Sequence, residues 1–150
     1  MIVPAGELSP HRLLIVTGHF GTGKTEFSVN LALALARAGE KVMMADLDIV
    51  NPYFRSRERR AVLERAGVRL ITSSQDSENA DMPSLPAEIL TVLEDRSYRG
   101  LLDIGGDPDG ARVLARYQPK ITAEDYQLIF VSNANRPEVR TAEDAISYLR

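Results

Sequence analysis

The segment from Gly18 to Thr25, GHFGTGKT, constrains this chain more than any other. It fits the pattern G-x-x-x-x-G-K-[ST], in which glycines let successive backbone N–H groups turn inward toward phosphate oxygens. In this pattern the lysine reaches the β- and γ-phosphates and the hydroxyl binds Mg²⁺. A glycine-rich turn without a ligand is the alternative, but chance matches to all the fixed positions are rare. The predicted nucleotide-binding residues are Gly18, His19, Phe20, Gly21, Thr22, Gly23, Lys24, Thr25 and Glu26.

The sequence on either side of this segment predicts a strand before it and a helix after it. The run RLLIVTG, 12–18, is continuously apolar from Leu13 to Val16 and ends in Gly, as in a strand buried on both faces. From Lys24 to Ala38 the apolar residues recur at helical spacing, and Gly39 supplies a stop. Such a helix would direct the positive end of its dipole at a phosphate.

The same alternation continues to the end of the chain. Further strands are predicted at 41–48, 68–74, 100–106 and 126–134, and further helices at 57–67, 86–95, 110–117 and 141–150. This order favours an α/β fold with a doubly wound, mostly parallel sheet of the phosphate-loop NTPase type. The last helix begins at a capping-box-like TAED and has no stop before Arg150. We interpret residues 1–150 as one nucleotide-binding domain, the N-terminal part of a longer chain truncated after the fifth strand and its helix; a terminal helix that simply ends is the alternative.

Composition excludes several classes of protein. The 150 residues suit a single domain, and the absence of cysteine excludes disulfides and Cys-ligated metals. A net charge of −3 does not favour a dedicated nucleic-acid surface. No apolar run is long enough to span a bilayer, and the N-terminus lacks the layout of a signal peptide. We therefore expect a cytoplasmic protein.

Three aspartates lie toward the carboxyl ends of predicted strands. Asp46 and Asp48 end the run KVMMADLD, and Asp103 ends GLLD. A triphosphate site needs carboxylates for Mg²⁺ and its waters, and a group that positions the attacking water. Ligands bind at the carboxyl edge of an open α/β sheet, where these residues would lie. Residues two apart on a strand share a face, so Asp46 and Asp48 would both face the nucleotide if the strand extends that far. The alternative is a set of solvated or turn-capping carboxylates.

The segments GHFGTGKT, VMMADLDIVNPYFRSRE, LLDIGGD and VSNANRPEVRTAED together resemble the MinD/ParA/CobQ-type nucleotide-binding domains, and more closely an uncharacterised ATP-binding branch of that class. The resemblance spans residues 13–150. It implies a parallel sheet, Mg-ATP binding, slow hydrolysis and, often, dimerisation that depends on the nucleotide.

The resemblance also implies roles for single residues. Asp48 would position or activate the attacking water, Asp103 would be the Walker-B carboxylate, and Asp46 would lie near the metal. The implied catalytic residues are Lys24 and Asp48, and the implied metal residues are Thr25, Asp46 and Asp103.

One position departs from the family pattern. Many members carry a second lysine at the second position of the loop, where it reaches the nucleotide of a partner subunit; this chain has His19. His19 is either an exposed loop residue or, when protonated, a substitute for that lysine. The arginines of FRSRERR are either a solvated helix face or the trans-acting groups; they are Arg55, Arg57, Arg59 and Arg60.

Three functions remain open from the sequence. The first is a slow Mg-ATPase that acts as a switch, controlling a homodimer or a partner protein. The second is an ATP-dependent ligase or phosphotransferase of the dethiobiotin-synthetase kind, with SSQDSENADMPS at 73–84 as either a pocket wall or a surface loop. The third is a nucleotide-binding module without turnover. The sequence lacks the N-K-x-D motif that would favour guanine. Asn133 and Asn135 either lie near the base or are turn and cap residues.

Overall fold

The computed structural model describes residues 9–48, 60–72, 87–135 and 140–148, which contain a five-stranded parallel sheet with strand order β3-β2-β4-β1-β5. The strands are β1 Leu13–Thr17, β2 Val42–Asp46, β3 Arg69–Thr72, β4 Arg99–Asp103 and β5 Tyr126–Phe130. The helices are α2 Lys24–Arg37, α3 Arg60–Arg65, α4 Ile89–Glu94, α5 Pro108–Ile121 and α6 Ala142–Tyr148. All pairings are parallel.

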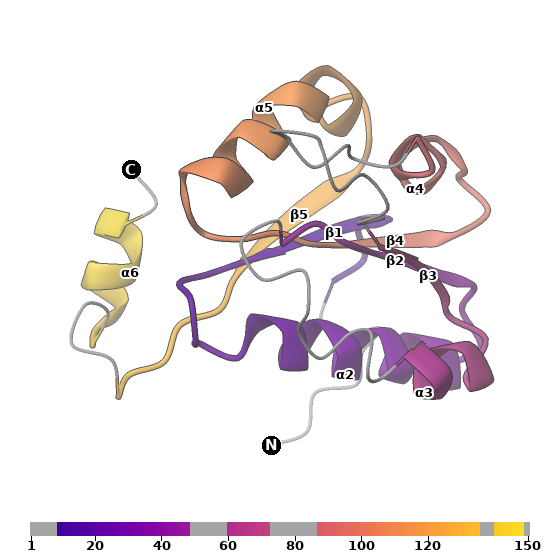
Figure 1. Ribbon diagram of the computed structural model, residues 1–150, viewed down its shortest axis with the longest axis horizontal. Coiled ribbons are helices and arrows are strands. Elements are labelled where there is room, and N and C mark those ends of the chain that lie inside the picture. Colours follow the sequence, from indigo (N-terminus) through magenta and orange to yellow (C-terminus); the bar gives the residue numbers. More distant parts are fainter. Residues whose placement is uncertain (1–8, 49–59, 73–86, 136–139, 149–150) are drawn as a thin grey trace, which may run out of the picture.

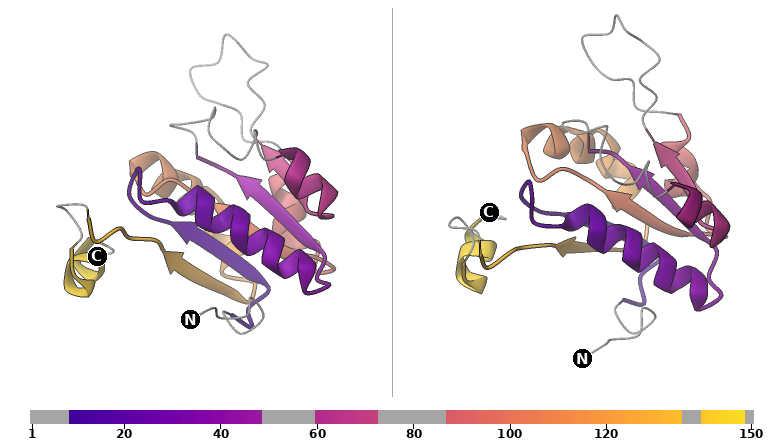
Figure 2. Two further views of the ribbon diagram at one scale, coloured as in Figure 1. Left: turned by 90° about the horizontal axis from the view of Figure 1, so that it is seen from below. Right: turned by 60° about the horizontal axis from the view of Figure 1, so that its bottom comes forward.

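Helices cover both faces of the sheet, which confirms the doubly wound expectation. In Figure 1, α2 and α3 lie below the sheet, and α4 and α5 lie above it. Alternate residues of β1 point to opposite faces: Ile15 packs in the cluster with α4 and α5, and Val16 packs in the cluster with α2 and α3. Figure 2 shows α6 apart from the helices that cover the sheet. No described helix is long and apolar enough to cross a membrane.

The parallel register brings the functional strand ends to one edge. β1 lies between β4 and β5 and is buried along its whole length, as the apolar run predicts. Asp46 of β2 pairs with Asp103 of β4, and Asp103 pairs with Val16 of β1. The segment 18–25, which we call the phosphate loop, therefore meets two of the three predicted aspartates at the carboxyl edge of three adjacent strands.

One helix is longer than its sequence pattern predicts, and another has the N-terminal cap that the sequence predicts. A short helix is predicted at 110–117, but α5 has 14 residues. The Asp107 carboxylate accepts a hydrogen bond from the Gly110 N–H at 2.8 Å, and Pro108 occupies the first turn, where it needs no N–H partner. This start signal, Asp-Pro, precedes the run from which the helix was predicted. The capping box predicted for α6 is confirmed: the Asp144 N–H donates to Thr141 Oγ1, and the Thr141 N–H donates to Asp144 Oδ2.

Candidate functional site

The phosphate loop connects β1 to α2 and is folded on itself. Both the N–H and the hydroxyl of Thr22 donate to the His19 carbonyl, at 3.2 and 2.8 Å. Gly23, immediately before α2, has φ 91°, which favours glycine. At Gly18 a β-carbon would stand 2.2 Å from the Val131 carbonyl oxygen, so no side chain fits there. The fixed glycines of the motif are thus required by backbone geometry and by close packing.

The start of α2 suits an anion. The N-cap residue is Gly23, which has no side chain that could cap the first turn. The first helical hydrogen bond runs from the Phe27 N–H to the Gly23 carbonyl. First-turn N–H groups have no partner within a helix and carry its positive dipole end. Lys24, the first residue of α2, is 7% exposed. Backbone donors and a buried ammonium therefore converge where the sequence places phosphates.

Lys24 forms an ion pair with Asp48. Lys24 Nζ lies 2.5 Å from Asp48 Oδ2, and the two side chains are only 8% and 11% exposed. The strand predicted to reach Asp48 ends at Asp46, so the strand-face argument does not extend to Asp48. Instead, the Asp48 N–H turns back and donates to Asp46 Oδ1 at 3.3 Å. A local turn, rather than strand alternation, brings Asp48 to the phosphate loop.

Asp103 is the most unusual group at this edge. It is fully buried, and neither of its carboxylate oxygens has a hydrogen-bond partner among the described residues. The pKa of Asp103 is raised to about 7, mainly because burial desolvates the carboxylate. The charges of Asp46 and Asp48 also act to raise this pKa, whereas Lys24 and the Thr25 hydroxyl act to lower it. A buried polar group of this kind is normally satisfied by hydrogen bonds or by a ligand.

These residues fit a Mg²⁺ ion that arrives with a nucleotide. Within the described ranges, no cluster of three or more His, Asp or Glu side chains is arranged to hold a metal alone. Mg²⁺ commonly takes only one or two protein oxygens and completes its shell with waters and phosphate oxygens. The unpartnered Asp103 carboxylate and the nearby Thr25 hydroxyl are oxygen donors of that kind, with Asp46 beside them in register.

The loop between β4 and α5 packs directly on the phosphate loop. A β-carbon at Gly106 would lie 2.5 Å from the Gly18 carbonyl oxygen, and one at Gly105 would lie 3.4 Å from Asp48 Oδ1. A β-carbon at Gly110 would lie 1.8 Å from the Gly105 carbonyl oxygen. The sequence gave no indication of these close contacts at Gly105, Gly106 and Gly110. The structure therefore links the phosphate loop, Asp48 and the start of α5.

Replacing Gly106 by alanine is expected to push the phosphate loop away from β4. The added methyl group would clash with the Gly18 carbonyl, so we expect a loss of about 1–3 kcal/mol in the free energy of unfolding. Affinity for Mg-ATP should fall about tenfold, since a displacement of the loop misaligns its N–H donors. Gly39→Ala is the matched control: Gly39 has φ 90° but no neighbour within 4 Å, so stability should fall without a loss of affinity. Urea denaturation and calorimetry measure both effects, and equal affinity losses in the two variants would contradict the contact.

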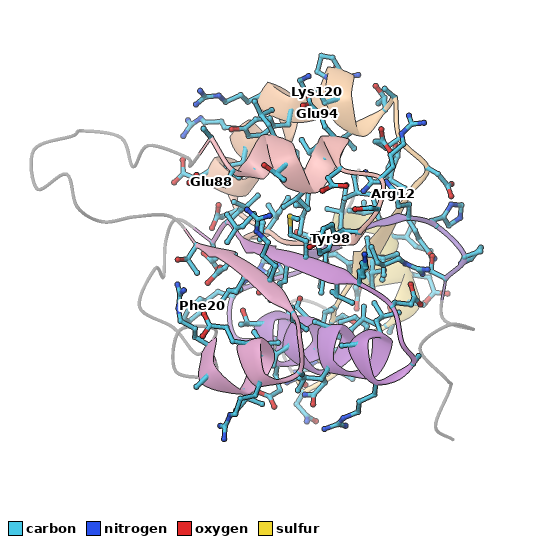
Figure 3. The ribbon with its side chains drawn as sticks, turned by 90° about the vertical axis from the view of Figure 1, so that its right-hand side faces the viewer. Arg12, Phe20, Glu88, Glu94, Tyr98 and Lys120 are labelled. Carbon is cyan, nitrogen blue, oxygen red and sulfur yellow. The ribbon has the colours of Figure 1, made fainter. Side chains whose placement is uncertain are left out.

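The two loop residues His19 and Phe20 and the arginines near α3 are the other candidates from the sequence. His19 is half-buried and engaged in an interaction, whereas Phe20 is 72% exposed; Figure 3 shows Phe20 and Arg12 at opposite ends of the sheet. Arg60 donates to Glu64 of its own helix and to Thr72 of β3. Arg55, Arg57, Arg59 and the stretch 73–84 lie outside the described residues.

The two asparagines after β5 are joined by a local hydrogen bond. The Asn135 N–H donates to Asn133 Oδ1 at 3.0 Å, which is the geometry of an Asx turn. This contact accounts for Asn133 as a turn residue, one of the two interpretations that the sequence left open. A contact of either residue with a base stays untested.

Comparison with known proteins gives one family over most of the chain. Residues 13–136 match the family CbiA, described as the CobQ/CobB/MinD/ParA nucleotide binding domain. A segment of 45 residues is 51% identical to the antiactivator FleN of Pseudomonas aeruginosa, covering 29% of this chain and 16% of FleN. A segment of 42 residues is 45% identical to the cytosolic Fe-S cluster assembly factor NUBP2 of Homo sapiens, covering 28% of this chain and 16% of NUBP2. No solved structure gives a significant match. With the family match extending from the first residue of β1 to beyond β5, this chain belongs to the CobQ/CobB/MinD/ParA nucleotide-binding domain family.

Proposed function

We propose that this chain binds Mg-ATP at the carboxyl edge of its sheet, hydrolyses it slowly, and changes its association with itself or a partner according to the bound nucleotide. The buried Asp103 carboxylate without a partner carries the proposal, because it lies beside the phosphate loop and matches the oxygen ligand that a Mg-nucleotide needs. ATP is favoured over GTP because the chain has no N-K-x-D motif. A cytoplasmic location is part of the proposal.

Each residue at the site has a task in this proposal. The backbone of Gly18–Thr25 and the Lys24 ammonium would bind and orient the phosphates, and the Thr25 hydroxyl and Asp103 would hold the metal, with Asp46 close to it. Bound Mg²⁺ supplies charge neutralisation on the phosphate oxygens. Asp48 accepts a hydrogen bond from the attacking water and sets its direction. The work is therefore mainly positioning and electrostatic stabilisation, as is usual in phosphoryl transfer.

The packing around Gly105 and Gly106 supports a role as a switch. This loop contacts both the phosphate loop and Asp48, and it leads directly into the Asp107 cap of α5. Phosphates that displace Asp48 or the phosphate loop would therefore act on the start of α5. The exposed Phe20 offers an apolar side chain for association at the mouth of the site.

Calorimetry with Mg-ATP, Mg-GTP and ADP, together with light scattering, tests this function. We expect Mg-ATP to bind more tightly than Mg-GTP, to be hydrolysed slowly without a second substrate, and to change the molecular mass or the binding of a partner relative to ADP. Consumption of ATP only in the presence of a second substrate would show a ligase or phosphotransferase instead. Binding without turnover would leave a nucleotide-binding module, and the absence of binding would refute the proposal.

A further inference from the structure

The Lys24–Asp48 pair occupies the place where phosphates are proposed to bind. Lys24 Nζ and Asp48 Oδ2 are 2.5 Å apart, and both side chains are almost fully buried. We propose that Asp48 is a competitor of the nucleotide for Lys24: phosphates must displace it, and only then is Asp48 released to position the attacking water. This inference rests on the proposed function and adds a second role for Asp48, namely control of nucleotide affinity.

The charges at the site explain why the pair opposes binding. The Asp48 carboxylate neutralises the ammonium that would attract the β- and γ-phosphates, and it places a further negative charge beside them. Asp46 and the buried Asp103 lie on the adjacent strands, so Lys24 faces several carboxyl groups. Coulomb interactions are strong in such poorly solvated surroundings. A nucleotide can therefore contact Lys24 only after the ion pair is broken, and the free energy needed to break the pair weakens nucleotide binding.

The exchange needs only a local movement. The Asp48 backbone is tied to Asp46 by the hydrogen bond to Oδ1, at 3.3 Å, so Asp48 stays at the site when its side chain leaves Lys24. Its other oxygen, Oδ1, already faces the β4–α5 loop, 3.4 Å from where a β-carbon of Gly105 would stand. Rotation of the side chain between staggered rotamers is enough to separate it from Lys24. The released carboxylate would then remain beside the phosphate loop, where a water-positioning group is needed.

This double role predicts opposite effects of one substitution on affinity and on turnover. Asp48→Asn keeps the shape of the side chain but removes the charge that holds Lys24. If Asp48 only positioned water, its substitution would lower turnover and leave affinity unchanged. If Asp48 only supported the fold, its substitution would lower both turnover and affinity. The competitor role predicts tighter binding with slower turnover, a combination that neither alternative gives.

The test uses ADP in the presence of EDTA, so that loss of a metal contact does not enter the comparison. We expect Asp48→Asn to bind ADP at least about tenfold more tightly than wild type by calorimetry, because the fraction of protein with Lys24 available rises. Single-turnover hydrolysis of Mg-ATP should fall at least about 100-fold with loss of the water-positioning group. Asp48→Glu keeps the carboxylate and should not show the gain in affinity. Asp109→Asn, which removes the same charge from an exposed side chain at the start of α5, should bind ADP as wild type does.

Two results distinguish failure of this inference from failure of the proposed function. If wild type binds no nucleotide, the proposed function itself is wrong. If wild type binds Mg-ATP and requires Lys24, but Asp48→Asn binds ADP no more tightly than wild type, the competitor role is overturned. Should Asp48→Asn not fold, Asp48→Ser also removes the charge and carries the same expectation.

Discussion

Replacing Lys24 by alanine is expected to raise the dissociation constant for Mg-ATP at least about 100-fold, or about 2.7 kcal/mol in binding free energy. The ammonium is the only charged donor that the motif supplies to the β- and γ-phosphates. Its loss also leaves the Asp48 carboxylate, 11% exposed, without its cation and beside the phosphates. Calorimetry with Mg-ATP measures the effect, and equal binding by wild type and Lys24→Ala would remove the basis of the nucleotide site.

A double variant separates binding from folding in this experiment. Lys24→Ala alone should lower the free energy of unfolding by up to about 3 kcal/mol, because a buried carboxylate loses its partner. Lys24→Ala with Asp48→Ala removes both charges, so stability should recover while Mg-ATP binding stays lost. Lys120→Ala is the control for loss of a lysine, since Lys120 pairs with Glu94 on the exposed surface of α5 and α4. It should bind Mg-ATP as wild type does.

Replacing Asp103 by asparagine is expected to stabilise the nucleotide-free protein more strongly at pH 8 than at pH 5. Burial raises the pKa of Asp103 to about 7 from an ordinary value of 3.8, so the folded protein holds this proton more tightly than the unfolded chain does. The contribution of Asp103 to stability therefore falls as the pH rises from about 4 to about 7. Asparagine has the same shape and no proton to lose. We expect an advantage for the variant of at least about 1 kcal/mol at pH 8, given about 1.36 kcal/mol per unit of pKa difference.

The same substitution should remove the function that the buried carboxylate serves. Turnover of Mg-ATP by Asp103→Asn should fall at least about 100-fold, because an amide is a poor substitute for an anionic metal ligand. Mg-ATP should also raise the melting temperature of wild type more than that of the variant at pH 8. Urea denaturation at pH 5 and pH 8, with and without Mg-ATP, measures these effects. An identical pH dependence in both proteins would contradict the assignment of the raised pKa to Asp103.

Elements defined by continuous apolar runs were predicted well, and those defined by local backbone chemistry less so. The run before the phosphate loop gives β1, because a strand buried on both faces must be apolar throughout. The second strand was predicted to reach Asp48, but it ends at Asp46 with a turn closed by the Asp46 carboxylate. For α5 the apolar pattern alone missed the start at Pro108, which the Asp107 cap determines. Side-chain contacts with the backbone, rather than periodicity, set these boundaries.

The sequence by itself determined the family, the parallel α/β architecture and the set of charged groups at the carboxyl edge. A phosphate loop between an apolar run and an amphipathic helix admits few folds, and parallel strands bring their carboxyl ends to one side. Only the tertiary structure decided how those groups are paired. Two of these contacts join segments that are far apart in the chain, namely the Lys24–Asp48 ion pair and the close approach of Gly106 to Gly18. The burial of Asp103 without a hydrogen-bond partner among the described residues also depends on the packing of distant segments. Such contacts depend on strand order, register and burial, none of which is encoded in the spacing of residues within a single motif.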